Sequence, residues 1–525
     1  MTRKTEIVLL LLIVVAGLCL RLSGLYWGEG YHLGAIGDEI NAYRVALEFG
    51  AGEREAQYIG QPNFPKNGTA HLPGPLWAML WSIPVRFGGG PEAMIALIAV
   101  LNTLVILFVY VLVEKVVGRP YALWAALFHA TLPWPVYSSV GCWNPQVMGF
   151  LGALLYLVLW EVVTRPHSRH VFWVCVLLGM MPQFHMFGTF LVPSVLVLLG
   201  LRWEQVNKKW LGAGLLASVL LYVPYLWGES QNHWNNTRRM FGASEPFTFG
   251  CLKSLALPIV SLSNLMNSTL EYDFQSYVAF GRAAFGSFAI LGFFNLLSLA
   301  LGVLAVVTFV VALVRAMRGK WLSPRRAFGE STRLLFLGIM LFLPLLLFLS
   351  TGHNFNMRYL VALYPLLSVL PAMLVVNVSV RWRTVILGCM ALTVGFNVIL
   401  IPVLFRYDQR LIAEADYFVP SFRKMETVLR RLKADAGVAI PIEIDASAFP
   451  KTLQDKQAVA MRALARYVET CERFDPTVER AHPVRLYRAE SAANLVDTKE
   501  PVVYQGNGIG FIRLGFDAGT RRSQP

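Results

Sequence analysis

Charged side chains are scarce in this sequence. Only 15% of its 525 residues are Asp, Glu, Lys or Arg, whereas about 25% are charged in an ordinary soluble protein. Hydrophobic residues make up 56% of the chain, and apolar runs of roughly 20 residues, enough to span a bilayer as a helix, recur along most of it. This composition excludes an ordinary soluble enzyme and predicts a polytopic α-helical membrane protein.

Several common motifs are missing as well. The six cysteines are scattered and form no CxxC pair or other metal-type spacing, which counts against a zinc site and a disulfide framework. A Gly-rich phosphate loop, a GxSxG elbow and an HExxH helix are also absent. These absences count against nucleotide-binding, serine-hydrolase and zinc-peptidase functions.

Positive charges prevail among the few charges, and the formal net charge is +14. In a membrane protein this excess is explained by basic residues in the cytoplasmic loops, so no nucleic-acid partner is expected. With the N-terminus inside, the predicted cytoplasmic loops contain Lys115 and Arg119, Arg165 and Arg169, Arg202 with Lys208 and Lys209, Arg315 to Arg326, and Arg381 with Arg383. The outer loops 138–144, 182–186 and 351–357 contain no Lys or Arg.

The N-terminus has features of a secretory signal, because Arg3 and Lys4 precede the apolar run from Ile7 to Leu20. No small-residue cleavage site follows this run. We therefore expect an uncleaved first span with a cytoplasmic N-terminus, in the inner (plasma) membrane of a bacterium.

About ten further spans are expected from the apolar runs, at 92–114, 121–137, 146–163, 171–184, 187–202, 210–227, 285–314, 334–350, 359–378 and 384–404. They leave a first outer loop at 27–91 and a second large one at 228–286. In the first loop, the stretch from Pro75 to Phe87 is apolar but too short to cross a bilayer, and its Trp77 and Trp81 are four residues apart. This pattern predicts an interfacial helix.

Charge becomes dense after the last span. Residues 406–525 are expected to form a small extracytoplasmic α/β domain, for which about 120 residues suffice, while residues 1–405 form the transmembrane domain. The patterns predict helices at 421–434 and 456–473 and strands at 438–444, 484–487, 502–505 and 509–514.

The acidic pair Asp38 and Glu39 follows the first span by about a dozen residues. Acidic side chains so near a membrane span are costly to desolvate and are often functional, and an outward-facing carboxylate can take a proton as a general base. The structural alternative is that Asp38 caps a helix starting near Ile40. Both interpretations stay open for the residues taken alone.

Other polar residues on the outer side suit a lipid phosphate. Arg358 can bind phosphate through parallel hydrogen bonds, and His71, His185 and Tyr359 lie on the same expected face. Each basic or imidazole group has a structural alternative: His71 can open the turn before Pro73, His185 can be a packing residue, and Arg358 can snorkel to the interface.

A third group could contact a sugar or an acceptor. It consists of Asn144, Trp234 and His353. Asn144 can instead cap the helix that follows it, and Trp234 can belong to an interfacial aromatic belt. The acidic pair could hold a divalent metal, but no metal site or other cofactor is assigned.

The order of these features resembles a known family. The residues that carry the resemblance are Gly37-Asp38-Glu39, His71-Leu72-Pro73-Gly74-Pro75-Leu76, Leu132-Pro133 before Ser138-Ser139, and Arg358-Tyr359-Leu360 with Tyr364-Pro365. Over about 400 residues, their order and topology are similar to the GT-C glycosyltransferases of the protein O-mannosyltransferase and aminoarabinose transferase type. The resemblance is strongest to their bacterial relatives of the dolichyl-phosphate-mannose-protein type.

The resemblance implies a GT-C fold with about 11 transmembrane helices and inverting transfer of a hexosyl or pentosyl group from a polyprenyl-phosphate donor. The acceptor hydroxyl, on a glycan, lipid or protein, would lie on the extracytoplasmic face. Asp38 takes the family's catalytic position with Glu39 beside it, and Arg358 takes the donor-phosphate position. The chain departs from the aminoarabinose transferases, which usually have Lys at His71, Lys near His185 and Asp near Asn144.

Two other functions stay open. A transporter or flippase of a lipid-linked sugar would more often show broken helices and repeated halves, which the sequence does not reveal. A membrane scaffold or receptor would leave the acidic outer loop unexplained.

Overall fold

The structure, a computed structural model, describes most of the chain's hydrophobic part. The described residues are 2–26, 37–50, 58, 60, 62–63, 70–241, 274–318, 324–349, 357–414, 442–444, 484–487 and 511–514. Within them, seven helical segments are long and apolar enough to cross a membrane, or eight if the bent pair α10 (Lys208–Leu221) and α11 (Val223–Gln231) forms one span. The chain is therefore an integral membrane protein, as its composition predicts.

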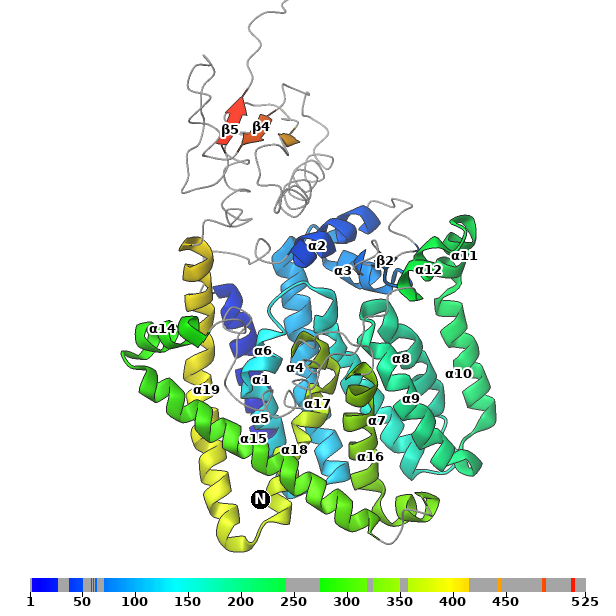
Figure 1. Ribbon diagram of the computed structural model, residues 1–525, viewed down its shortest axis with the longest axis vertical. Coiled ribbons are helices and arrows are strands. Elements are labelled where there is room, and N and C mark those ends of the chain that lie inside the picture. Colours follow the sequence, from blue (N-terminus) through cyan, green and yellow to red (C-terminus); the bar gives the residue numbers. More distant parts are fainter. Residues whose placement is uncertain are drawn as a thin grey trace, which may run out of the picture.

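The long helices form one bundle (Figure 1). They are α1 (Arg3–Tyr26), α4 (Pro91–Val116), α7 (Met148–Thr164), α15 (Phe288–Met317), α16 (Pro324–Leu349) and α19 (Val380–Glu414), together with the broken helix made of η5 (Met357–Leu363), α17 (Tyr364–Leu367) and α18 (Val369–Asn377). Shorter apolar helices complete the bundle: α5 (Arg119–Thr131), α6 (Pro133–Tyr137), α8 (Val171–Phe184) and α9 (Phe187–Leu201). Every span expected from the sequence is wholly or largely helical, but a count of about 11 crossings stays a prediction because several of these helices are short.

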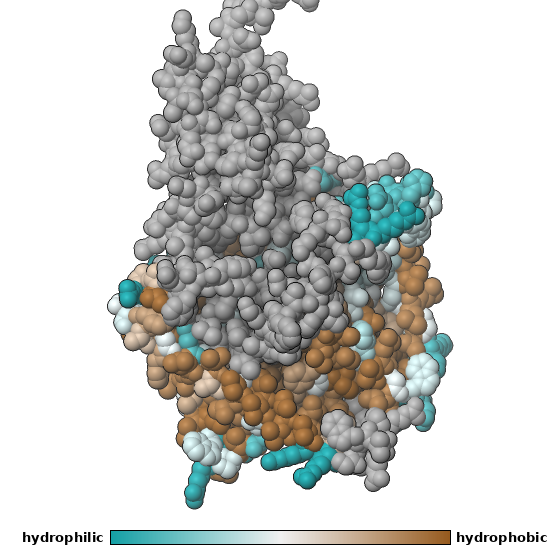
Figure 2. Space-filling view, viewed as in Figure 1, coloured by the Kyte–Doolittle hydropathy of each residue, from teal (hydrophilic) through white to brown (hydrophobic). Residues whose placement is uncertain are grey.

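The broken helix forms the centre of the bundle. Almost all residues from Leu360 to Val375 are buried, and the neighbouring helices pack around them. In contrast, α1 turns Val8, Leu11 and Leu12 outward, as a helix does that faces lipid. Figure 2 shows the resulting band of hydrophobic side chains on the visible face of the bundle.

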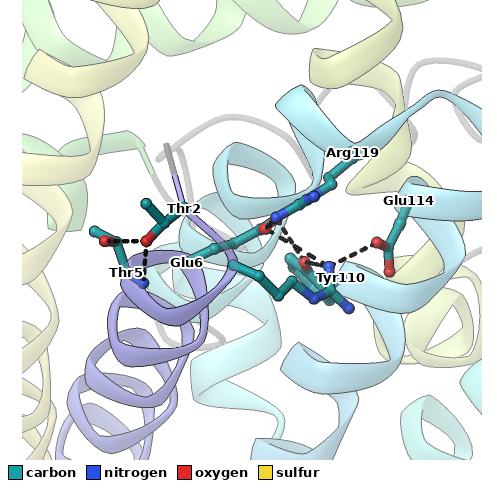
Figure 3. A network of polar contacts seen from close by, with 7 residues as sticks. Thr2, Thr5, Glu6, Tyr110, Glu114 and Arg119 are labelled. Atoms are coloured by element: carbon teal, nitrogen blue, oxygen red, sulfur yellow. Dashed lines mark hydrogen bonds and ion pairs between the residues drawn. The ribbon is translucent and has the colours of Figure 1, made fainter.

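The basic loops gather at the end of the bundle where α1 begins. There Glu6 is buried and accepts hydrogen bonds of 2.6 Å each from the Tyr110 hydroxyl and from Nε of Arg119 (Figure 3). Hydrogen bonding to Glu6 raises the pKa of Arg119 above its ordinary value. Arg3 pairs with Glu114 at 2.9 Å. The network thus ties α1 to α4 and α5 through charges that neutralise one another.

The opposite end of the bundle carries a separate layer. It consists of α2 (Gly37–Gly50), α3 (Leu76–Arg86), the two-residue strands β1 (Pro62–Asn63) and β2 (Ala70–His71), α11 and α12 (Asn235–Phe241). In Figure 1 this layer lies at the top and the start of α1 at the bottom.

The helix expected from Pro75 to Phe87 is present as α3 and has two distinct faces. Trp77 and Trp81 are fully buried against α2 and the bundle, whereas Met79, Ile83 and Phe87, each four residues from the next, are exposed. An exposed apolar stripe on one side and a packed side on the other are typical of a helix at a membrane interface.

Three strands are described beyond the bundle. Strand β4 (Val484–Tyr487) pairs in parallel with β3 (Ile442–Ile444) and antiparallel with β5 (Phe511–Leu514). All three lie within strands predicted from the sequence. The fourth predicted strand, 502–505, and both predicted helices of this region lie outside the described residues, so the α/β domain stays a prediction. Helix α19 continues past the expected boundary at Arg406 to Glu414. Helix α14 (Phe274–Phe285) packs against α15 and α19.

Candidate functional site

Asp38 and Glu39 occupy the first turn of α2, which begins at Gly37. The backbone N–H groups of a first turn carry partial positive charge and favour carboxylates, so the structural interpretation of Asp38 is compatible with this position. The helix is held in place farther along by Ala42, Tyr43 and Ala46, which are buried against α3. The acidic pair therefore belongs to the first turn of a helix whose later turns pack against α3.

His71 ends the short strand β2 and is held through its backbone. The side chain of Asn236, in α12, accepts from the His71 N–H at 2.5 Å and donates to its carbonyl at 3.0 Å. The ring Nδ1 of His71 lies 2.9 Å from the carbonyl of Gly60. A carbonyl only accepts, so Nδ1 carries a proton, and Nε2 can donate to a phosphate only when the ring is charged.

Beyond His71, the chain is tied to the bundle by Gln183, at the end of α8. The Gln183 amide donates to the carbonyl of Leu221 at 3.2 Å and accepts from the N–H of Leu76 at 3.5 Å. Gly74 adopts a φ of 135° and lies directly on the Gln183 side chain, where a Cβ would overlap it. The turn between β2 and α3 therefore depends on a glycine at this position.

Asn144 contacts the end of α8 at Phe184, the residue before His185. The Asn144 side chain, in η2 (Asn144–Val147), is buried and donates to the carbonyl of Phe184 at 2.6 Å. Nδ1 of His185 accepts from the N–H of Phe187 at 3.2 Å. The proton of a neutral His185 ring is therefore on Nε2, which makes it a donor without a positive charge. The two histidines thus differ in the protonation that phosphate binding would require.

Arg358 and Tyr359 lie in the first turn of η5, which packs against α7 and η2. The contact with α7 is close, because Gly152 lies against the Ala362 carbonyl and the Tyr156 hydroxyl donates to that same carbonyl at 2.8 Å. The segment that carries Arg358 therefore adjoins the segment that carries Asn144. His353 lies outside the described residues.

Trp234 connects α11 and α12 and has a positive φ of 60°. The turn is stabilised by buried Glu229, which accepts from both the N–H and the hydroxyl of Thr237 at 2.7 Å. Tyr225 bonds to the Thr237 hydroxyl and accepts from Asn236. Through Asn236 this network reaches His71, so the Trp234 turn adjoins β2.

The structure thus brings together the expected segments that it describes. Helix α2 contacts α3, and the β2–α3 turn contacts the end of α8. The end of α8 contacts η2, η2 contacts η5, and β2 contacts α12. In the described part of the chain, no group of three or more His, Cys, Asp or Glu residues is placed to hold a metal.

The residues that hold this arrangement are not those that sequence reasoning selects. Gln183, Asn236 and Glu229 were not predicted as members of the site. The only sequence signal for Gln183 is a polar residue inside the apolar run 171–184. Asn236 is one of three asparagines among residues 232–236, and nothing in the sequence distinguishes it.

Known structures share this fold. ArnT from Cupriavidus metallidurans, bound to undecaprenyl phosphate, superposes with a TM-score of 0.60 and 10% sequence identity over 98% of both chains. The apo state of the same protein gives a TM-score of 0.58 and 12% identity, also over 98% of both chains. The archaeal oligosaccharyltransferase AglB from Archaeoglobus fulgidus gives 0.49 at 12% identity, over 94% of this chain and 70% of its own.

No protein-family model matches the sequence, and no curated protein matches it. The resemblance to GT-C glycosyltransferases of the aminoarabinose transferase type is confirmed in the structure, as a shared fold along nearly the whole chain.

Proposed function

We propose that this protein is an inverting glycosyltransferase that moves a sugar from a polyprenyl-phosphate donor to an acceptor hydroxyl on the extracytoplasmic side of the membrane. The observation that supports the proposal is the series of contacts that links the expected segments β2, α8, η2 and η5. The shared fold with ArnT, over 98% of both chains, supports the same class of reaction.

In the proposed reaction, the acceptor oxygen attacks the anomeric carbon of the donor sugar. Asp38 takes the proton of the attacking hydroxyl, with Glu39 beside it. The bond between the anomeric carbon and the phosphate oxygen breaks on the opposite side, so the configuration inverts and polyprenyl phosphate leaves. Because phosphate is already a stable leaving group, no nucleotide sugar is needed.

Arg358 and Tyr359 are the proposed donor-phosphate residues, together with the histidines. A neutral His185 can donate through Nε2, whereas His71 must be protonated to do so, given their Nδ1 contacts. Asn144, Trp234 and His353 remain candidates for contacting the donor sugar or the acceptor. The acceptor hydroxyl would belong to a protein, a lipid or a glycan.

The test uses purified protein in nanodiscs with a labelled polyprenyl-phosphate sugar and measures the released polyprenyl phosphate. We expect Asp38→Asn to abolish release while folding and insertion are retained. Glu48→Gln, at the other end of the same helix, should keep wild-type turnover. Loss of a general base should leave at most about a few per cent of turnover. If Asp38→Asn retains more than this, Asp38 does not have this role.

The same assay distinguishes transfer from translocation. A flippase leaves the bond between sugar and phosphate intact, so it would move the labelled lipid without releasing polyprenyl phosphate. Release that depends on an added acceptor is the result expected of a transferase.

A further inference from the structure

A pocket with a volume of about 800 Å³ opens in the outer layer, between the end of α2, α3 and α11. It lies beside Phe49 and Gly50, the last residues of α2. Asp38 is eleven residues earlier on the same helix, or about 16 Å away at 1.5 Å per residue. The pocket is therefore separate from the acidic pair, and its volume is in the range of ligand sites, about 300–1,000 Å³.

One wall of the pocket is polar and already assembled. Asn232, at the end of α11, donates to the hydroxyl of Tyr58 at 3.2 Å and to the carbonyl of Gly228 at 3.1 Å. Gly228 lies directly on the Tyr58 ring, where a Cβ would overlap it. Gln231, exposed at the same wall, adds a second amide. The wall thus offers hydrogen-bonding groups without a charge.

Arg86 supplies the charge. Among the lining residues that the structure describes, it is the only ionisable one apart from Tyr58, and none of them is a carboxylate. Its guanidinium carbon lies 5.6 Å from the centre of the Phe49 ring, which orients it by a cation–π contact. Among the residues that the structure describes, none forms an ion pair with Arg86. An oriented, unpaired guanidinium favours an anion in the pocket.

The rim of the pocket is apolar and exposed. Trp227, on α11, is 70% exposed, and Met79 belongs to the exposed stripe of α3 that continues to Phe87, which is 87% exposed. Figure 2 shows hydrophilic side chains over α11 and α12 directly above hydrophobic ones over α10. This level therefore corresponds to the membrane interface, where aromatic side chains such as Trp are enriched.

We propose that this pocket binds the anionic phosphate headgroup of an outer-leaflet phospholipid, with the acyl chains following the exposed stripe of α3. Arg86 would bind the phosphate, Gln231 and Asn232 the neighbouring headgroup oxygens, and Trp227 and Met79 the start of the chains. The combination of one cation, amides and a lipid-facing rim fits an amphipathic anion better than a free sugar or a peptide.

The test is lipid binding by native mass spectrometry of the full-length protein, with phosphatidylglycerol and phosphatidylcholine as probes. We expect Arg86→Gln to weaken phosphatidylglycerol binding about tenfold, the loss of one charged hydrogen bond. Phosphatidylcholine has the same phosphate but no net charge, so its binding should weaken by less. Gln231→Leu should weaken phosphatidylglycerol binding less than Arg86→Gln does. Arg381→Gln, which removes an exposed arginine at the opposite end, is the matched control and should change nothing.

Equal phosphatidylglycerol binding by wild type and Arg86→Gln would overturn the proposal. So would displacement of the bound lipid by glycerol phosphate at equal concentration, because the ligand would then be a free anion. Thermal unfolding of each variant checks its fold. The measurement does not involve transfer, so its outcome is independent of the proposed function.

Discussion

At the scale of single residues, the side chain of Asn236 completes the backbone hydrogen bonding of His71. Its amide bonds to both the N–H and the carbonyl of His71, as a neighbouring strand would. Backbone groups in such half-buried positions need partners, and β2 is too short to obtain them from β1 alone. A residue outside the expected site therefore fixes the position of one within it.

Replacing Asn236 tests this arrangement. Asn236→Ala removes both bonds to His71 and the bond to Tyr225, so we expect a loss of about 2 kcal/mol in the free energy of unfolding and a lower transfer rate. Thermal unfolding and released polyprenyl phosphate are the measurements. Asn235→Ala, an exposed neighbour, is the control and should behave as wild type. Equal behaviour of the two variants would show that the His71 segment is held by other contacts.

At the scale of elements, close helix packing positions the layer formed by α2, α3, α11 and α12. Helices α8 and α10 approach through Gly214, whose Cβ would lie 2.8 Å from the carbonyl of Phe172. Small residues allow such approach in membranes, where packing and not hydrophobicity holds helices together. This contact matters for the site because Gln183, on α8, bonds to the end of α10.

Two glycines of α10 provide a matched comparison. Gly212 has nothing within 4 Å of the position of a Cβ, so Gly212→Ala should be neutral or stabilise by up to about 1 kcal/mol through helix propensity. Gly214→Ala forces α8 and α10 apart, because a backbone carbonyl cannot rotate away, and should destabilise by about 1–3 kcal/mol. Thermal unfolding in nanodiscs measures both. A stabilising Gly214→Ala would contradict the packing described here.

At the scale of the whole molecule, the two ends of the bundle differ in chemistry. Buried Glu6 and its exposed partners Arg119 and Arg3 lie with the basic loops at one end, and α2, α3, α11 and α12 lie at the other (Figure 1). The positive-inside rule predicts that the basic end faces the cytoplasm. The acidic pair and the phospholipid pocket would then face the outside.

Cysteine labelling tests this orientation. In a variant without the native cysteines, Asn235→Cys should react with a membrane-impermeant maleimide in intact cells. Arg381→Cys should react only after the membrane is opened, because Arg381 lies in the basic loop before α19. The reverse pattern would place the acidic pair in the cytoplasm and exclude an extracytoplasmic reaction.

Much of this protein is determined by the sequence alone. The apolar runs, the asymmetry of Lys and Arg between loops, and the four-residue spacing of Trp77 and Trp81 each reflect a local free energy of transfer to the membrane, which does not depend on distant residues. The membrane class, the helical segments and α3 therefore follow from the sequence, as do the three described strands. The resemblance in the order of motifs indicated the fold.

Only the tertiary structure decided which segments meet and what holds them. Asn236 and His71 are separated by 165 positions in sequence, and Gln183 and Leu76 by 107, so no local pattern could relate them. The pocket at Arg86 likewise depends on α3 and α11 lying side by side, and on a glycine that lets Tyr58 approach. Polar contacts of this kind are short-range and directional, so they exist only once the helices have packed.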